Sequence, residues 1–315
     1  MAHIAKVSFV IPCYGSEHTL QNVVEEIKST MVPLQKYSYE IIMVSDASPD
    51  HVIDVIKSLC DRDPEHCRGI EFARNFGQHA ALMAGFRAAS GEFIVSLDDD
   101  GQAPVEAVPA MLAALADADV VYGAYAHKKH NVFRNFGTKI DGLMAEKLLG
   151  KPRGLKTTSF FAVRRFVIEE ISRYANPYPY LLGLILRTTK NIVNIPVNHR
   201  PRTEGQSGYT FRKLLRLWIN GFTAFSVVPL RIATLCGFIC AILGFLGVLW
   251  CIINKLMRPE VPMGYSSMMT AIIFIGGMLM LMLGMIGEYI GRTYICINSA
   301  PQYVIRKMIP EKHDE

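Results

Sequence analysis

Short apolar runs alternate with amphipathic segments over about the first 125 residues of the chain. Strands are predicted at the runs VSFVI, YEIIMVS, GIEFA, EFIVSL and ADVVYGA, which are rich in β-branched and aromatic residues. Between them apolar residues recur at helical spacing, which predicts helices over about 18–30, 51–60, 77–89 and 105–116. This rhythm is typical of an α/β fold, a mostly parallel sheet with helices on both faces.

The pattern changes from residue 131, where a helix, the short segment LKTTSFFAV, a further helix and the strand NIVNIPVNH are predicted in turn. Next, the segment FRKLLRLWINGF, residues 211–222, places its apolar side chains on one face and its basic side chains elsewhere. We expect an amphipathic helix lying on a membrane surface, with a core helix of the soluble domain as the alternative.

Two uncharged apolar stretches follow, at residues 232–254 and 261–287. Each is longer than the roughly 20 residues that a helix needs to cross a bilayer core. Buried helices of a soluble protein are rarely this long without a charge, so the sequence predicts a transmembrane hairpin with spans at about 232–254 and 263–287. The predicted division is a soluble domain at 1–210, an interfacial region at 211–230, the hairpin at 231–291 and a tail at 292–315.

Basic residues flank the outer ends of the hairpin. They are Arg212, Lys213, Arg216 and Arg231 before it, and Arg292, Arg306, Lys307 and Lys312 after it, against Lys255 and Arg258 in the connecting loop. Because cytoplasmic loops carry the excess of basic residues, the soluble domain and the tail are expected in the cytoplasm. No secretory signal is visible, and an odd number of cysteines without a CxxC pair fits a reducing compartment. The net charge of +5 is explained by these basic residues, which would face anionic lipid, so no nucleic-acid partner is expected.

The stretch VSLDDDGQAP places three aspartates directly after a predicted strand. In an extended chain Asp98 and Asp100 share one face and Asp99 points away, while Gln102 returns to the first face. Two convergent hard carboxylates suit Mg²⁺ or Mn²⁺, which take further ligands from the phosphates of a substrate. A DxD alone is weak, because acidic turns after strands are frequent. Neither GxGxxG nor GxxxxGK[ST] is present, so a nucleotide would be held in another way.

A series of motifs covers nearly the whole chain: VSFVIPCYGSEHTL, IIMVSDASPD, ARNFGQHAALMAGFRAASGE, LDDDGQAP, RTEGQSGYTFRKLL and GMIGEYIGRTYICINSAPQYVI. In this order they resemble the polyprenyl-phosphate branch of glycosyltransferase family 2, which includes dolichol-phosphate mannose synthase and undecaprenyl-phosphate sugar transferases. The resemblance implies a GT-A, Rossmann-like nucleotide-diphospho-sugar transferase fold. It also implies a metal that holds the donor diphosphate, and transfer to a lipid phosphate at the cytoplasmic face of the inner membrane.

The resemblance implies roles for particular residues, position by position. It implies that the base and the ribose of the donor are contacted by Pro12, Tyr14, Glu17 and Asp46, and that the metal is held by Asp98, Asp100 and Gln102. It further implies that Arg202 binds the donor diphosphate, and that Arg134 and Thr138 bind the acceptor phosphate. Asp100 and Arg202 are the residues expected to carry catalysis. Structural alternatives stay open: Glu17 as a charge in the first turn of a helix, Arg134 as a solvated helix residue, and Arg74 and Asn75 as residues that only shape their turn.

The chain departs from the family pattern at three places. Ser45 opens SDAS where relatives often have DDGS, Gly208 replaces a usual lysine, and no acid precedes the aromatic pair of LKTTSFF. A lipid monophosphate is already largely ionised near neutral pH, so it needs no general base. We therefore expect a single displacement with inversion. Thr157, Thr158 and Ser159 are expected to hydrogen-bond the sugar or the acceptor.

Other functions were weighed against this one. A membrane polysaccharide synthase of the same superfamily would need more spans, and the chain has no QxxRW motif. A non-catalytic membrane adaptor with a degenerate transferase domain would be expected to lose its metal ligands, and a carrier would be expected to bear charges within its spans. Through the resemblance we expect a UDP-sugar as the donor, undecaprenyl phosphate as the acceptor and a homo-oligomer, commonly a tetramer. The sequence does not name the sugar.

Overall fold

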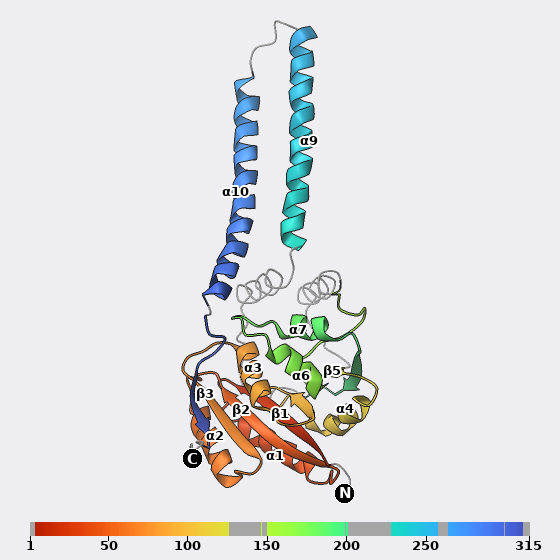
Figure 1. Ribbon diagram of the computed structural model, residues 1–315, viewed down its shortest axis with the longest axis vertical. Coiled ribbons are helices and arrows are strands. Elements are labelled where there is room, and N and C mark those ends of the chain that lie inside the picture. The colour runs from red at the N-terminus through yellow and green to blue at the C-terminus, as the bar shows by residue number, and fades with distance from the viewer. Residues whose placement is uncertain are drawn as a thin grey trace. The chain divides into compact units, whose positions relative to one another are not determined.

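The computed structural model describes residues 4–125, 146, 150–198, 200, 228–257, 264–298 and 300–310. The chain divides into two compact units: Met1–Leu214 together with Ala300–Glu315, and Leu215–Ser299. The first unit is an α/β domain and the second contains two long helices, as Figure 1 shows.

The elements of the α/β unit follow the predicted order. They are β1 (Ala5–Cys13), α1 (Leu20–Met31), β2 (Tyr37–Ser45), α2 (Val52–Arg62), β3 (Cys67–Phe72), α3 (Gln78–Ala88), β4 (Phe93–Ser96), the 3₁₀ helix η1 (Val105–Ala107), α4 (Val108–Ala114), β5 (Val120–Tyr125), β6 (Phe161–Arg164), α6 (Arg165–Ser172), α7 (Leu181–Thr188), β7 (Ile192–Val197) and β8 (Ile305–Ile309). Each strand and helix predicted before residue 125 is present, with its ends displaced by a few residues.

The strands form one sheet in the order β7-β5-β6-β4-β1-β2-β3-β8. Strands β1 to β4 are mutually parallel where they pair, and β5 is parallel to β7. Strand β6 runs antiparallel to both β4 and β5, and β8 runs antiparallel to β3. The predicted α/β class with a mostly parallel sheet is therefore confirmed.

Helices cover both faces of the sheet. On one face Phe9, Ile41 and Met43 are completely buried in the main hydrophobic core, to which α1, α2 and α4 contribute. On the other face α3 packs against β1 and β2. Its close approach depends on Gly85, because a Cβ there would lie 2.3 Å from Cγ1 of Val10. The periodicity of the strands thus fixes two apolar faces, and each face has its own helices.

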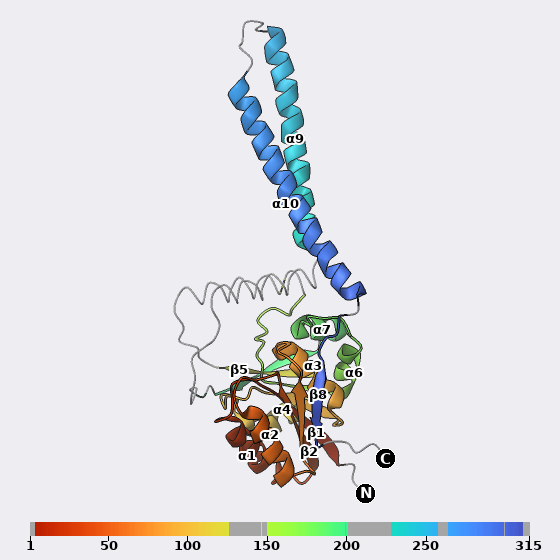
Figure 2. The same ribbon diagram turned by 90° about the vertical axis from the view of Figure 1, so that its left-hand side faces the viewer.

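The C-terminal segment belongs to this sheet. Strand β8 pairs with β3 in a register that matches Ile309 with Gly69, and Figure 2 shows this strand in blue within the α/β unit. The tail expected from residue 292 onward therefore contains the last turns of one helix and an edge strand. Its sequence, IRKMI, shows no apolar alternation, because an edge strand exposes most of its side chains.

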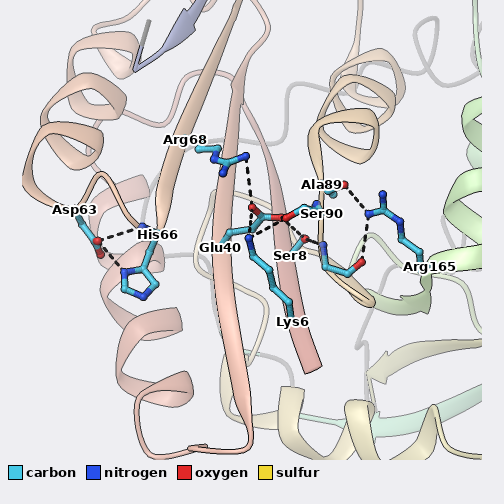
Figure 3. Close-up of polar contacts among 10 residues, drawn as sticks. Lys6, Ser8, Glu40, Asp63, His66, Arg68, Ala89, Ser90 and Arg165 are labelled. Carbon is cyan, nitrogen blue, oxygen red and sulfur yellow. Dashed lines mark hydrogen bonds and ion pairs between the residues drawn. The ribbon is translucent and has the colours of Figure 1, made fainter. Parts of the chain in front are cut away.

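A buried carboxylate joins three elements near the amino ends of the central strands (Figure 3). Glu40 of β2 is 1 % exposed and accepts hydrogen bonds from Ser8 Oγ at 2.6 Å and from the backbone N–H of Ser90 at 2.7 Å. Lys6 Nζ lies 2.9 Å from its other oxygen. Burial opposes ionisation, but these donors outweigh it and lower the pKa of Glu40 to about 2.

The second unit contains α9 (Val228–Met257) and α10 (Tyr265–Ile297), which lie side by side. Gly237 of α9 faces Met282 of α10 closely enough that a Cβ would lie 2.3 Å from the methionine Cε. Among the described residues, only α10 has an apolar window, Phe274–Gly291, that is long enough to cross a bilayer. Helix α9 covers the other predicted span, and the apolar stretch described within it, Gly237–Gly247, is shorter. Residues 211–222, predicted as an interfacial helix, lie outside the described residues.

Candidate active site

The strand order reverses direction between β1 and β4. The chain adds β2 and β3 on one side of β1 and then crosses to place β4 on the other side. In open α/β sheets ligands bind beyond the carboxyl ends of the strands at such a reversal. The loops after β1 and β4, residues 14–19 and 97–104, meet at this point. The DDDGQ motif therefore lies where the topology favours a ligand.

The middle aspartate of the motif holds these two loops together. Asp99 Oδ2 accepts the backbone N–H of Tyr14 at 2.9 Å, and its carbonyl oxygen accepts the hydroxyl of Thr19 at 2.6 Å. Burial raises the pKa of Asp99 above its usual value, against the lowering effect of the Tyr14 N–H. Asp99 thus has a structural role, in agreement with its predicted direction away from Asp98 and Asp100.

Asp98 is bound by two side chains from other parts of the chain. Gln78, the first residue of α3, donates its amide to Oδ1 at 2.8 Å. Ser159, in the loop before β6, donates its hydroxyl to Oδ2. Sequence reasoning assigned no role to Gln78 and expected Ser159 to contact the sugar or the acceptor. The structure instead aims the Ser159 hydroxyl at a carboxylate of the motif.

The chain does not stay extended through the motif. Strand β4 ends at Ser96, and the turn that follows requires a φ of 71° at Gly101, which glycine adopts without strain. Asp100 Oδ1 stabilises the turn by accepting the backbone N–H of Gln102 at 3.1 Å. The extended geometry used to place Gln102 beside the two carboxylates is therefore wrong, and the turn sets the position of its amide.

Tyr125, the last residue of β5, senses the charge of the two outer aspartates. Burial raises the pKa of its hydroxyl to about 12, and the negative charges of Asp98 and Asp100 contribute to the rise. A negative potential made by two carboxylates is attractive to a hard divalent cation. The described residues contain no group of three or more His, Cys, Asp and Glu side chains that could hold a metal by themselves. The oxygen ligands of Asp98 and Asp100 would fit an ion of this kind that takes further ligands from phosphate oxygens.

The carboxylate of Asp46 accepts hydrogen bonds from the backbone of the loop before α3. Its two oxygens accept the backbone N–H groups of Phe76 and Gly77, at 2.6 and 2.8 Å, and Asn75 donates its amide to the Asp46 carbonyl at 3.3 Å. Burial raises the pKa of Asp46, against these two N–H bonds. The guanidinium of Arg74 lies 4.5 Å from the centre of the Phe76 ring. These contacts shape the loop before α3, as the alternative for Arg74 and Asn75 supposed.

Glu17 and Asp50 connect the loops after β1 and β2 by reciprocal hydrogen bonds. Glu17 Oε2 accepts the backbone N–H of His51 at 2.8 Å, at the start of α2, and Asp50 Oδ2 accepts the N–H of Glu17 at 2.9 Å. A carboxylate at the amino end of a helix is favourable, so Glu17 has a structural role at a neighbouring helix. Pro12 lies within β1, and Tyr14 presents an exposed ring, 55 % accessible, beside the loop.

The SDAS sequence adopts an unusual backbone. Ala47 has a φ of 48°, a left-handed conformation that costs an L-residue free energy and that glycine adopts freely. Ser45, two positions before Ala47, ends β2 and is buried with 2 % of its surface exposed. Backbone strain of this kind concentrates at ligand-binding turns.

The other hydroxyls of the predicted acceptor loop differ in their contacts. Thr158 Oγ1 lies 2.9 Å from the carbonyl oxygens of both Gly123 and Phe160. Its hydroxyl thus stabilises the junction of β5 and β6. Thr157 has no hydrogen bond to another described residue and is half-buried.

Arg134, Thr138 and Arg202 lie outside the described residues. Arg200, which precedes Arg202 by two positions, is described. Its guanidinium forms ion pairs with Glu26 of α1, at 2.6 Å, and with Glu106 of η1. Arg200 is thus fixed next to the 3₁₀ helix that follows the DDDGQ motif. The sequence shows no sign of a role for Arg200, because an arginine between a histidine and a proline carries no local signal.

Comparison with known proteins places these motifs in a family. The model of glycosyl transferase family 2 matches residues 8–172, and the model of the GtrB C-terminal hairpin matches residues 228–293. The chain is similar to the undecaprenyl-phosphate 4-deoxy-4-formamido-L-arabinose transferase of Yersinia enterocolitica, with 31% identity over 99% of this chain and 96% of that protein. The protein of the same description from Salmonella choleraesuis is 32% identical over 98% of this chain and 95% of its own length.

Solved structures show the same fold at low sequence identity. The crystal structure of glucosyl-3-phosphoglycerate synthase from Mycobacterium tuberculosis, in complex with phosphoglyceric acid, covers 70% of this chain and 79% of its own, with a TM-score of 0.52 and 16% identity. A crystal structure of the same synthase contains Mn²⁺, UDP-glucose and phosphoglyceric acid, and covers 70% of this chain and 78% of its own with a TM-score of 0.51 and 16% identity.

Proposed function

This chain belongs to glycosyl transferase family 2, and from that membership we propose that it transfers a sugar from a nucleotide diphosphate sugar to a polyprenyl phosphate at a membrane. One observation carries the proposal: the similarity to polyprenyl-phosphate sugar transferases extends from the α/β domain through the C-terminal hairpin. An acceptor that cannot leave the bilayer requires an enzyme that stays at the bilayer.

The donor side of the proposal rests on the DDDGQ turn. Asp98, Asp100 and Gln102 are the residues that would hold Mg²⁺ or Mn²⁺, which when bound neutralises charge on the leaving diphosphate. Asp99 keeps the turn attached to the loop after β1, and Gln78 and Ser159 fix the direction of the Asp98 carboxylate. Arg202 completes the donor site in this proposal by pairing with the diphosphate.

The acceptor side needs alignment more than proton transfer. A lipid monophosphate has a second pKa of about 6, so its oxygen is already anionic at neutral pH. No acid stands between Glu146 and Glu169, and Ser159 occupies the position before the aromatic pair. We propose that Arg134 and Thr138 hold the acceptor phosphate in line with the anomeric carbon, so that one displacement inverts that centre.

The proposed donor is a UDP-sugar and the proposed acceptor is undecaprenyl phosphate. The names of the bacterial relatives contain undecaprenyl phosphate, and the synthase that shares the fold binds UDP-glucose with Mn²⁺. The proposed orientation places the α/β unit at the cytoplasmic face, where nucleotide sugars are made. In this proposal the turn that contains Ser45 and Ala47 contacts the nucleotide. Because the chain departs from the family pattern at Ser45, the proposal does not name the sugar.

The test incubates the purified full chain in detergent with Mn²⁺, undecaprenyl phosphate and a panel of nucleotide sugars, and follows lipid-linked sugar by mass spectrometry. We expect one sugar to appear on the lipid. Asp100→Ala should abolish the product, whereas Asp54→Ala, which removes an exposed aspartate of α2, should leave the rate unchanged.

Two outcomes would contradict the proposal. A wild-type chain that binds nucleotide but transfers no sugar to any polyprenyl phosphate would favour a non-catalytic adaptor. A chain that extends a sugar polymer without a lipid phosphate would favour a polysaccharide synthase. Equal loss in Asp100→Ala and Asp54→Ala would remove the special role of the DDDGQ turn.

A further inference from the structure

The chain that follows α10 returns directly to the α/β unit. Helix α10 ends at Ile297, and only residues 298–301 precede Gln302, whose side chain is 7 % exposed. The backbone N–H of Ala73 then bonds to the carbonyl of Val304 at 2.9 Å, and β8 continues as a partner of β3. A segment of roughly ten residues is therefore integrated into the fold, although it comes after the helix predicted to cross the membrane.

Arg87, in the last turn of α3, is the centre of this contact. Its Nη1 donates to Gln302 Oε1 at 3.0 Å and to the hydroxyl of Tyr303 at 2.9 Å. Its Nε and Nη2 donate to the carbonyl of Ser172 at 3.2 and 3.1 Å, and Nη2 also donates to the carbonyl of Tyr174 at 2.8 Å. A guanidinium has five N–H donors in a planar fork, and all of them are used here. A lysine has three donors and no fork, so it cannot reproduce this set.

Neighbouring contacts hold the same segment from two further sides. Gln302 Nε2 donates to the carbonyls of Tyr174 and Asn176, at 3.3 and 2.9 Å, in the loop between α6 and α7. The ring of Tyr303 stacks on the ring of Phe72 with centroids 5.1 Å apart and an angle of 7° between planes. The segment thus bridges β3, α3 and the loop after α6.

Helix α3 reaches from this contact to the DDDGQ turn. Its first residue, Gln78, donates its side-chain amide to Asp98, and its next residue, His79, donates Nδ1–H to the carbonyl of Pro179 at 3.0 Å. Its last turn carries Arg87. The helix that orients a carboxylate of the candidate site is thus the helix that binds the chain returning from the hairpin.

We propose that Arg87 is a positioning residue that fastens the chain after α10 to the transferase domain, so that the domain acts on an acceptor phosphate embedded in a bilayer. The inference rests on the proposed function and adds that Arg87 matters when the acceptor phosphate is embedded in a bilayer. Without the fastening, the site keeps its donor residues, but the chain after α10 no longer holds it, and only the chain that precedes α9 still connects the α/β unit to the hairpin. A short acceptor that diffuses in water does not need that connection.

The experiment compares two acceptors on the full chain reconstituted in phosphatidylglycerol and phosphatidylethanolamine vesicles: undecaprenyl phosphate in the bilayer and a short, water-soluble isoprenyl phosphate. We expect Arg87→Ala to lower kcat/KM on the embedded acceptor about tenfold or more, with less than about a threefold change on the soluble acceptor and in the KM for donor. Arg87→Lys should recover only part of the loss, and Gln302→Ala should resemble Arg87→Ala. Arg173→Ala is the matched control, since this exposed arginine of the same region pairs with Glu170 alone among the described residues.

Hydrogen exchange separates the inference from the function on which it rests. Backbone N–H groups of residues 300–310 should exchange about tenfold faster or more in Arg87→Ala than in the wild type. Equal losses on both acceptors, no loss on either, or unchanged exchange of this segment would overturn the inference. A wild type that is inactive on both acceptors would contradict the proposed function instead, and the exchange result would then decide whether Arg87 fastens the segment.

Discussion

Three consecutive aspartates with the same chemistry have three different surroundings. Asp99 is half-buried and accepts a backbone N–H from the loop after β1, whereas Asp98 accepts hydrogen bonds from Gln78 and Ser159. Asp100 stabilises its own turn through the N–H of Gln102. Asp98 and Asp100 both contribute to the raised pKa of Tyr125. At the scale of a residue, the partner decides the role of each carboxylate.

Ser159 provides a test of how close this loop lies to the metal that we propose. In Ser159→Asp a second carboxylate stands beside Asp98, and two unit charges about 4 Å apart repel by roughly 4 kcal/mol at an effective dielectric constant near 20. A divalent cation relieves this repulsion. We therefore expect Mn²⁺ to bind roughly threefold more tightly or better, measured in the presence of UDP from the electron paramagnetic resonance signal of free Mn²⁺.

Ser159→Asn is the matched control, because it adds a polar group of similar size without a charge. Equal Mn²⁺ affinities in the two variants would show that residue 159 lies too far from the ion to act on it. Weaker binding in Ser159→Asp than in Ser159→Asn would mean that the ion is not held next to Asp98.

At the scale of an element, buried polar bonds decide how the central strands are held together. Glu40 joins β2 to Ser8 of β1 and to the turn at Ser90, and Gly91 lies so close that a Cβ there would be 2.7 Å from the carbonyl oxygen of Lys6. A buried carboxylate of this kind stabilises the fold only while it is ionised and paired. This cluster lies near the amino ends of the strands, away from the carboxyl ends where the candidate site is built.

The low pKa of Glu40 predicts how stability depends on pH. The folded pKa is about 2, below the ordinary value of 4.5, so the stabilisation is complete above pH about 4.5 and is lost as the pH falls toward about 2. Replacing Glu40 by Gln should lower the free energy of unfolding near neutral pH by about 3 kcal/mol. The difference between the two proteins should shrink as the pH falls through that window, measured by denaturant unfolding in detergent.

Glu169→Gln is the control for this measurement, because Glu169 is 60 % exposed and pairs with Arg165 on the surface of α6. Its effect should stay below about 1 kcal/mol. A Glu40→Gln deficit that stays constant down to the acid limit would mean that shape, and not charge, carries the contribution of this side chain.

At the scale of the whole molecule, the hairpin sets where the α/β unit works. Large apolar side chains are exposed along both helices, including Phe238 and Trp250 of α9 and Phe274 and Leu283 of α10. Surfaces of this extent are covered by lipid or by another protein. The match to the GtrB C-terminal hairpin identifies this part as the membrane-associated one.

The distribution of basic residues predicts the direction of the hairpin. Alkaline phosphatase, which is active only outside the cytoplasm, should be active when fused after Glu260 in the connecting loop and inactive when fused after His313. A fusion to a fluorescent protein that matures only in the cytoplasm should give the opposite result. Activity of both phosphatase fusions would show that the chain crosses the membrane once, and inactivity of both would show that it does not cross.

The amino-acid sequence by itself determined the elements of the α/β unit before residue 125, their order and the mostly parallel class of the sheet. Apolar periodicity is a local property, so a short run of letters carries it. The family motifs also identified the aspartates of the turn and the apolar C-terminal segments, because a few consecutive residues are enough to show each.

The tertiary structure alone decided which of these residues meet. Ser159 reaches Asp98 across 61 positions, and Gln302 reaches Arg87 across 215 positions. Strand β8 joined the sheet although two of its five residues are charged, because β3 offered an unpaired edge. Such contacts depend on the path of the whole chain, and no window of sequence contains both partners. The fold could therefore be predicted from patterns, whereas the bonds that orient the candidate site could only be found in three dimensions.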